Sequence, residues 1–392
     1  MSSNSAAVKK SSLGHLPGKW NIFFGILCAV FGTTAGRKLA AHILIGGLRR
    51  TLLRLPLALR SGLVKRILGL QSERRARKIM YQMTHPYGYQ WDWITPVTTK
   101  NGARGYWIGK GIKENGGTPY AEETAKDLDL VFYYVHGGAF RMGHALMYMA
   151  SFTTILEQLQ KEHGIRARIF SIEYGLSPEV TWPQPREQCE EAYRYLVQDL
   201  GIPNSKIVMG GDSAGGNLTA VTLLSLRKQL RQDNVVSFSS LPRLPLGLPA
   251  AAVLISPWVM LDATAPSYDT NFTKDCLPLL KGVRPSWYFS SFDKMSPEEQ
   301  AAVLQDPDVS PLLANLEGLC PTLVAYGNHE VFQSDIESFI ARLQRDKVHV
   351  DIIARNAPHV WIIEPTLAPS INMYAQGIAE LSNWLARAVE RK

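Results

Sequence analysis

The sequence predicts an α/β fold, with a mostly parallel sheet that carries helices on both faces. From about residue 95 onward, short β-rich apolar runs alternate with longer stretches of helical spacing. Such alternation is typical of parallel sheets, because each crossover between parallel strands uses a helix. The chain has 392 residues, 46% of them hydrophobic and 9% aromatic. This is enough for one large α/β domain with a cap, or for two domains.

Each expected element rests on its own apolar run. We expect strands at 128–135, 166–174, 206–211, 250–258, 321–327 and 348–355. Helical spacing predicts helices at 187–200, 213–230, 336–346 and 371–390. Gly201 and Pro203 follow the first of these helices and mark its end.

Positive charge is concentrated at the N-terminus. Residues 1–80 hold 15 Lys and Arg and a single acid, Glu73, whereas the rest of the chain holds 27 Lys and Arg and 33 acids. A uniformly basic surface would indicate a nucleic-acid partner. The observed asymmetry instead predicts no nucleic-acid partner and an N-terminal arm that meets anionic lipid.

This arm, residues 1–70, combines two apolar features. The run at 20–32 is shorter than the roughly 20 residues that a spanning helix needs. The stretch at 39–70 interleaves leucines with Arg and Lys, as in helices that lie on a membrane surface, and Pro56 should interrupt it. We expect the arm to associate with a membrane, that of the endoplasmic reticulum. A disordered leader with one packed helix, a cleaved signal peptide and a mitochondrial presequence remain as alternatives.

A serine stands where an expected strand meets an expected helix. Gly211-Asp212-Ser213-Ala214-Gly215 has the pattern GxSxG, in which small residues let strand and helix approach around a sharp turn. Ser213 is therefore the candidate nucleophile, with Asp212 beside it. The start of the helix also favours developing negative charge. The alternative is an ordinary serine cap in a glycine-rich turn.

A second glycine motif follows the strand at 128–135. In His136-Gly137-Gly138-Ala139-Phe140, the bare backbone can approach a substrate oxygen closely. We expect the N–H groups of Gly137, Gly138 and Ala214 to form an oxyanion hole. His136 is expected to brace this loop through a hydrogen bond.

The base and the acid follow the last two expected strands. His359 lies on a loop after the strand at 348–355, the place of a base that comes last in chain order. Glu330 and Asp335 both follow the strand at 321–327. We favour Glu330, which is closer to the strand end and would fix the tautomer of His359. Asp335 is expected to cap the next helix.

The four cysteines, Cys28, Cys189, Cys276 and Cys320, show no metal-ligand spacing. No metal site is expected from them, and a pairing of Cys276 with Cys320 is left open.

Together these motifs resemble the hormone-sensitive-lipase family of α/β-hydrolases, which includes arylacetamide-deacetylase-like enzymes and fungal steryl acetyl hydrolases. HGGAF at 136–140 corresponds to the family's HGGGF-type loop, and GDSAGGN at 211–217 matches its elbow. EYGLSPE at 173–179 and LISPW at 254–258 also match family segments. HEVF at 329–332 departs from the usual DPL-type motif and is similar to fungal members that carry Glu.

The resemblance implies an α/β-hydrolase fold over residues 71–392, with a helical cap from about 71–100 and 262–312. Both pieces are rich in aromatic residues, which suit either an apolar substrate pocket or the cap's own core.

The resemblance also implies a serine carboxylesterase or deacetylase that needs no metal or organic cofactor. Its substrates would be short-acyl esters of apolar alcohols, such as sterol, terpenoid or secondary-metabolite esters. An amidase or aryl-formamidase and an acyltransferase remain as alternatives. A ligand-binding receptor of the same fold is a further alternative, against which the presence of His359 argues.

Overall fold

The computed structural model describes residues 53–70, 72–233, 246–279, 281–282 and 286–390, together with Gly32, Thr33, Gly47 and Thr51. The chain divides into two units, Met1–Thr51 and Leu52–Lys392, and nearly all described residues belong to the second. Residues 20–31 of the expected apolar run and most of 39–52 therefore lie outside the described residues.

The second unit is built on an eight-stranded sheet with the order β1-β2-β4-β3-β5-β6-β7-β8. Its strands are β1 Ile94–Thr98, β2 Arg104–Ile108, β3 Leu130–Val135, β4 Ala167–Ile172, β5 Ile207–Asp212, β6 Ala251–Ile255, β7 Thr322–Gly327 and β8 Val350–Arg355. β1 pairs antiparallel with β2, and β2 with β4, whereas β3 through β8 pair in parallel. The mostly parallel sheet is thereby confirmed.

Two strands were not among the expected ones. β1 and β2 have five residues each, which is too short for an alternating pattern to stand out from its surroundings. β1 also contains Pro96, and a proline is tolerated in a strand at the edge of a sheet.

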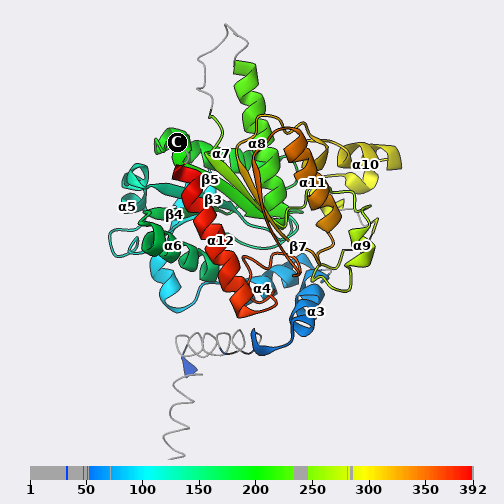
Figure 1. Cartoon of the computed structure of the whole chain (residues 1–392), viewed down its shortest axis with the longest axis horizontal. Coiled ribbons are helices and arrows are strands. Elements are labelled where there is room, and N and C mark those ends of the chain that lie inside the picture. The colour runs from blue at the N-terminus through cyan, green and yellow to red at the C-terminus, as the bar shows by residue number, and fades with distance from the viewer. Residues whose placement is uncertain are drawn as a thin grey trace, which may run out of the picture. The chain divides into compact units, whose positions relative to one another are not determined.

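Helices cover both faces of the sheet (Figure 1). α6 Met149–His163 and α12 Ile371–Glu390 pack together on one face, and α7 Gln184–Arg194, α8 Ser213–Asp233 and α11 Gln333–Arg345 lie on the other. Along β3, Val131, Tyr133 and Val135 join one hydrophobic cluster, whereas the residues between them join the other. Both faces are therefore buried, as expected for parallel strands.

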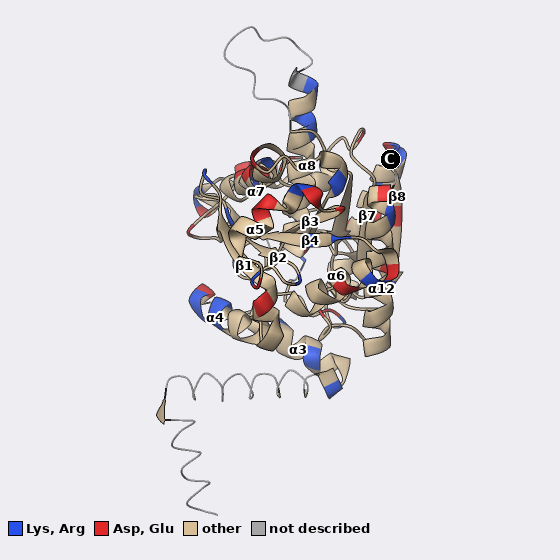
Figure 2. Ribbon diagram, turned by 90° about the vertical axis from the view of Figure 1, so that its left-hand side faces the viewer, with Lys and Arg blue, Asp and Glu red and all other residues tan. Residues whose placement is uncertain are grey.

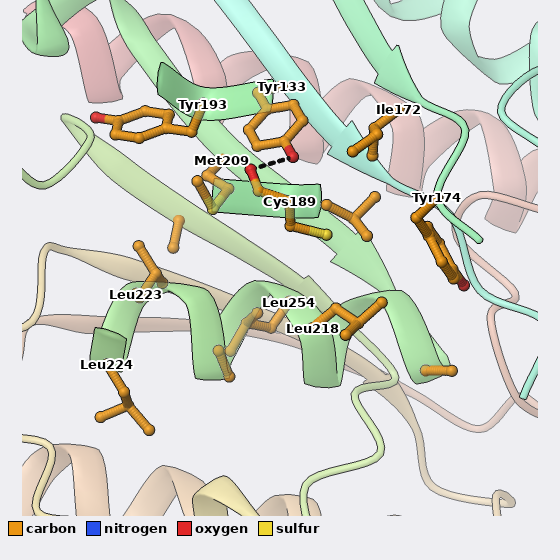
Figure 3. Packing of buried hydrophobic residues seen from close by; sticks show 14 of the residues in the cluster. Tyr133, Ile172, Tyr174, Cys189, Tyr193, Met209, Leu218, Leu223, Leu224 and Leu254 are labelled. Atoms are coloured by element: carbon orange, nitrogen blue, oxygen red, sulfur yellow. Dashed lines mark hydrogen bonds between the residues drawn. The ribbon is translucent and has the colours of Figure 1, made fainter. Parts of the chain in front are cut away.

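The core beneath the β5–α8 junction holds these two elements in place. Figure 3 shows Leu218 and Leu223 of α8 packed with Leu254 of β6 and Met209 of β5. The hydroxyl of Tyr133 donates a 2.9 Å hydrogen bond to the carbonyl of Cys189. Cys189, Cys276 and Cys320 are buried free thiols, so the pairing of Cys276 with Cys320 does not form.

The remaining elements lie before β1 and in the connections. α3 Leu57–Leu68, α4 Glu73–Thr84 and η1 Gly88–Trp93 precede β1, so the expected cap piece at about 71–100 also includes the first strand. The insertion between β6 and β7 holds α9 Ser267–Thr270, η5 Ser286–Tyr288, η6 Phe292–Lys294, α10 Pro297–Leu304 and η7 Pro311–Leu313. α5 Thr118–Glu123, η2 Ala125–Asp127, η3 Tyr195–Asp199 and η4 Asn204–Lys206 complete the fold.

Helix α3 begins directly after Pro56, where an interruption was expected. Lys and Arg occur along both α3 and α4 (Figure 2), but not all of them face solvent. The Arg60 guanidinium is buried and donates to the carbonyl of Thr366 at 2.9 Å, and Lys65 donates to the carbonyl of Phe272. Leu59, Leu63 and Arg66 are exposed on this helix.

Arg60 and Lys65 thus each satisfy a backbone carbonyl of the protein. Among the described residues, no helix combines the length and the apolar character needed to cross a membrane.

Candidate active site

Ser213 sits on a sharp turn between β5 and α8. Its backbone has a φ of 53°, in the left-handed region that a non-glycine residue seldom adopts. A Cβ on Gly215 would lie 2.1 Å from the carbonyl oxygen of Val135, so only glycine fits there. The same holds for Gly211, where a Cβ would lie 2.5 Å from the carbonyl oxygen of Gly215. The strained turn thus depends on the small residues of the GxSxG motif.

Glu330 and His359 meet directly. His359 Nδ1 lies 2.7 Å from Glu330 Oε2, and both side chains are buried. A carboxylate only accepts hydrogen bonds, so the proton of the neutral imidazole is assigned to Nδ1. His359 Nε2 has no hydrogen-bond partner within the part of the chain that the structure describes. The arrangement therefore leaves one basic nitrogen available for proton transfer.

The pKa values of this pair reflect burial and mutual charge. Burial lowers the pKa of His359, whereas Glu330, Asp275 and Asp212 raise it. Their combined effect exceeds that of burial, so the pKa lies above the usual 6.5. Burial raises the pKa of Glu330, and its hydrogen bond to His359 opposes this rise. His359 is thus a stronger base than a free imidazole.

A chain of contacts connects Ser213, the candidate nucleophile, with His359, the candidate base. The backbone N–H of Trp258 donates to the carbonyl of Ser213 at 3.0 Å. The Trp258 ring stacks on the Phe332 ring, with 5.4 Å between the ring centroids. The Phe332 ring meets the His359 ring edge-on, with 5.2 Å between the centroids. Ser213, Glu330 and His359 follow β5, β7 and β8, whose carboxyl ends lie along one edge of the sheet.

Ser256 joins the acid and the base loops. Its hydroxyl donates to Glu330 Oε1 at 3.1 Å and accepts from the N–H of Val360 at 3.0 Å. Glu330 Oε1 also accepts from the N–H of Gly327 at 2.5 Å. A Cβ on Gly327 would lie 2.0 Å from the carbonyl oxygen of Ala357, so this glycine allows the two loops to touch.

Asp275, from the insertion between β6 and β7, makes the second connection. Its Oδ1 accepts from the N–H of His359 at 3.0 Å and its Oδ2 accepts from the N–H of Val331 at 2.8 Å. The carboxylate is buried. Sequence reasoning missed Asp275, because it belongs to no motif and lies in a region expected to form only a cap.

Asp335, the other candidate acid, lies elsewhere. It is in the first turn of α11, whose N-cap residue is Phe332, and Asp335 does not cap this helix. The expected capping role of Asp335 is therefore wrong. Burial, followed by the charge of Asp262, raises the pKa of Asp335 to about 7. Asp335 Oδ2 has no hydrogen-bond partner among the described residues, so this carboxylate does not orient His359.

The N–H groups that are free in this region differ from the three that we expected to form an oxyanion hole. The N–H of Gly137 donates to Asp212 Oδ1 at 2.9 Å and is thus already occupied. Among the described residues, the N–H groups of Gly138 and Ala139 make no hydrogen bond. The N–H of Ala214, in the first turn of α8, has no acceptor within its helix. Gly138, Ala139 and Ala214 therefore offer unoccupied N–H groups, whereas the N–H of Gly137, an expected donor, is already bonded to Asp212.

The N–H of Gly137 is occupied because the buried side chain of Asp212 lies against this loop. In addition to Gly137, Asp212 accepts from the hydroxyls of Tyr134 at 2.9 Å and Tyr148 at 2.7 Å. Burial raises the pKa of Asp212, and these hydrogen bonds oppose the rise. Asp212 thus anchors the loop at 136–140.

His136 lies at the base of the same loop. Its Nδ1 is 2.7 Å from the carbonyl oxygen of Gly137, and its ring stacks on Tyr174 at 4.4 Å. The hydroxyl of Tyr174 donates to the carbonyl of His136 at 2.8 Å. These contacts fit the bracing role that the sequence suggested for this histidine.

Comparisons with known proteins bear on the fold and on the class of enzyme. Residues 132–363 match the family described as the alpha/beta hydrolase fold. An esterase of Acinetobacter venetianus is 28% identical over 220 residues, which cover 56% of this chain and 63% of that protein. An acetyl-hydrolase of Streptomyces hygroscopicus is 29% identical over 204 residues, which cover 52% of this chain and 58% of that protein. The chain thus matches less than two thirds of the length of each of these relatives.

Solved structures share the fold over a longer span. An esterase from the bacterial hormone-sensitive lipase family superposes with a TM-score of 0.63 at 26% identity, over 85% of this chain and 98% of that chain.

Proposed function

Because this chain belongs to the α/β-hydrolase fold family, in the group of the hormone-sensitive lipases, we propose that it is a serine carboxylesterase or deacetylase. Ser213 is the proposed nucleophile, His359 the base and Glu330 the acid. The observation that carries the proposal is the 2.7 Å contact between His359 Nδ1 and Glu330 Oε2, which leaves His359 Nε2 without a partner among the described residues.

In the proposed reaction, Ser213 Oγ attacks the carbonyl carbon of the ester while His359 Nε2 takes the hydroxyl proton. The N–H groups of Gly138, Ala139 and Ala214 stabilise the resulting oxyanion. The bond to the alcohol oxygen then breaks, and the alcohol leaves with the proton from His359. Water attacks the acyl-enzyme by the same route in reverse, and the carboxylic acid and free Ser213 are regenerated.

The proposed substrates are short-acyl esters of apolar alcohols, among them sterol, terpenoid and secondary-metabolite esters. An acetyl-hydrolase and an arylacetamide deacetylase are among the relatives. Aromatic rings also gather beside the oxyanion loop: Phe140 stacks on Tyr288 at 3.8 Å and on Trp258 at 5.7 Å. Such an apolar surrounding favours an apolar substrate.

We also propose that the N-terminal arm, residues 1–70, brings the enzyme to a membrane, that of the endoplasmic reticulum. The excess of Lys and Arg in residues 1–80 and the exposed Leu59 and Leu63 support this proposal.

Replacement of the nucleophile tests the reaction. Ser213→Ala should abolish both p-nitrophenyl acetate hydrolysis and covalent labelling by a fluorophosphonate probe, with an unchanged circular dichroism spectrum. Ser338→Ala is the matched control, because Ser338 is an exposed serine of α11. Labelling that persists in Ser213→Ala would overturn the assignment. Faster turnover of p-nitroacetanilide than of the ester would favour an amidase, and transfer of the acetyl group to an added alcohol would favour an acyltransferase.

A further inference from the structure

Arg77, in the middle of α4, holds three separate segments with one guanidinium group. Its Nε donates to the carbonyl of Arg141 at 2.6 Å, and its Nη2 donates to the carbonyl of Ser177 at 2.5 Å. Its Nη1 and Nη2 also contact the two carboxylate oxygens of Glu179, at 3.0 and 2.8 Å. Arg141 directly follows the loop at 136–140, so a side chain of α4 is bonded to the backbone next to the proposed oxyanion donors.

The loop that Arg77 holds has an unfavourable backbone. Gly138, Ala139 and Phe140 have φ values of 116°, 55° and 60°, all in the left-handed region. Two consecutive non-glycine residues in this region persist only where the surroundings hold them. A Cβ on Gly138 would lie 2.0 Å from the carbonyl oxygen of Met142, so the turn is also tight.

Arg77 acts on an oxyanion donor through one rigid peptide. The N–H groups of Arg141 and Met142 both donate to the carbonyl of Gly138, at 3.1 and 3.0 Å. This carbonyl and the N–H of Ala139 belong to the same planar peptide and point in opposite directions. Whatever holds the backbone of Arg141 therefore also sets the direction of the Ala139 N–H.

A second set of contacts closes around the same loop. The Arg141 guanidinium donates to Glu73 of α4 at 2.8 Å and lies 5.0 Å from the Trp287 ring. The indole N–H of Trp287 donates to the carbonyl of Ala139 at 2.9 Å, and the hydroxyl of Ser177 donates to the carbonyl of Trp287. Helix α4 and the insertion between β6 and β7 thus both contact the loop. The segment at 177–179 contacts both of them.

We propose that Arg77 is a positioning residue for the oxyanion hole, which keeps the N–H groups of Gly138 and Ala139 directed at the developing negative charge. This inference rests on the proposed esterase function. The ion pair with Glu179 is partly exposed and by itself would contribute little. The two carbonyl bonds are decisive, and a lysine cannot reproduce them together with the paired contacts to Glu179. Helix α4 then contributes to catalysis through Arg77, in addition to its expected place in the cap.

The test compares Arg77→Ala and Arg77→Lys with Arg75→Ala in the full-length protein. Arg75 lies on the same helix and is exposed, its backbone N–H donates to Ser72, and its guanidinium makes no hydrogen bond to another described residue. For p-nitrophenyl acetate we expect kcat to fall by about 10- to 100-fold in both Arg77 variants, since the donors are misdirected but not removed. KM should change less than about threefold, because the ground-state ester makes little use of these donors. Arg75→Ala should match the wild type.

A second readout separates positioning from a merely structural role. An alkyl trifluoromethyl ketone forms a tetrahedral adduct with an oxyanion, so its inhibition constant should rise by the same factor by which kcat/KM falls. Wild-type kcat in Arg77→Lys and Arg77→Ala, or a rise in KM alone, would overturn the inference. So would a loss of kcat that leaves the inhibition constant unchanged.

If Arg77→Ala does not fold, Glu179→Gln decides the question. It removes the charge partner of Arg77 but keeps Arg77 itself, and kcat and the inhibition constant should shift together by a smaller factor. The absence of any shift would overturn the inference. Failure of the proposed function is distinguishable, because it would appear as activity or probe labelling that survives in Ser213→Ala.

Discussion

The carboxylate of Asp275 lies 3.0 Å from the backbone nitrogen of His359, a residue 84 positions further along the chain. The same carboxylate accepts from the N–H of Val331, next to Glu330, at 2.8 Å. One buried side chain of the insertion thus fixes the backbone of both the acid and the base loops. Its negative charge also contributes to the raised pKa of His359.

Asp275→Asn should therefore impair catalysis although Asp275 does not touch the reacting atoms. An amide offers one acceptor oxygen where the carboxylate offers two, so one backbone N–H is left facing an NH2 group. We expect kcat to fall by about tenfold or more and the free energy of unfolding to fall by about 1–3 kcal/mol. Steady-state kinetics and urea unfolding measure the two effects. Asp269→Asn is the control, since Asp269 is an exposed acid of the same insertion. Wild-type kcat in Asp275→Asn would contradict this role.

The identity of the acid is tested by a pair of amide substitutions. Glu330→Gln should lower kcat by roughly 10³- to 10⁴-fold, because glutamine no longer fixes the tautomer of His359 or stabilises its charged form. Asp335→Asn should change kcat by less than about threefold, since Asp335 makes no contact with His359. A greater loss in Asp335→Asn than in Glu330→Gln would reverse the assignment.

The dependence of kcat/KM on pH should report the raised pKa of His359. The base must be neutral to accept a proton, so activity should increase as pH rises through a pKa above 6.5. In Glu330→Gln the charge that raises this pKa is lost, so the acidic limb of the residual activity should move to lower pH. Arg77→Ala does not touch this pair, and its acidic limb should stay in place. An unshifted limb in Glu330→Gln would show that another group titrates.

Asp335 should make stability depend on pH. Its pKa is about 7 in the folded protein and 3.8 as the reference value, so the unfolded chain binds fewer protons between these two values. The free energy of unfolding of the wild type should then decrease with rising pH by about 1.4 kcal/mol per pH unit relative to Asp335→Asn. Urea unfolding at pH 4, 5.5 and 7 measures this difference. Parallel stability curves for the two proteins would contradict the raised pKa.

The arm is tested by truncation. Deleting residues 1–38 should weaken binding to vesicles that contain phosphatidylserine but leave a salt-sensitive remainder through residues 39–70, at about 1 kcal/mol for each cation near the surface. Turnover of a soluble short-chain ester should hardly change, because the proposed catalytic residues all follow residue 130. Turnover of a membrane-dissolved ester should fall. Full-length protein that fractionates wholly with the cytosol would remove the basis of the membrane proposal.

Sequence alone was sufficient where the candidate site depends on residues that are neighbours along the chain. The turn at Ser213 needs small residues within two positions of it, and the ends of β7 and β8 place Glu330 and His359 by simple continuity. Six of the eight strands follow from apolar runs for the same reason. A short edge strand such as β1 leaves too weak a pattern to be found in this way.

Tertiary structure decided everything that depends on a partner far along the chain. The Asp212 carboxylate meets the N–H of Gly137, 75 positions earlier, and so removes Gly137 from the oxyanion donors. Asp275 and Arg77 carry no motif, and their proposed roles depend on the contacts that the insertion and α4 make with the loops of the candidate site. The inward turn of Arg60 on α3 has the same origin. Local backbone conformation is set by adjacent residues, whereas the direction of a polar side chain is set by whichever donor or acceptor the fold brings beside it.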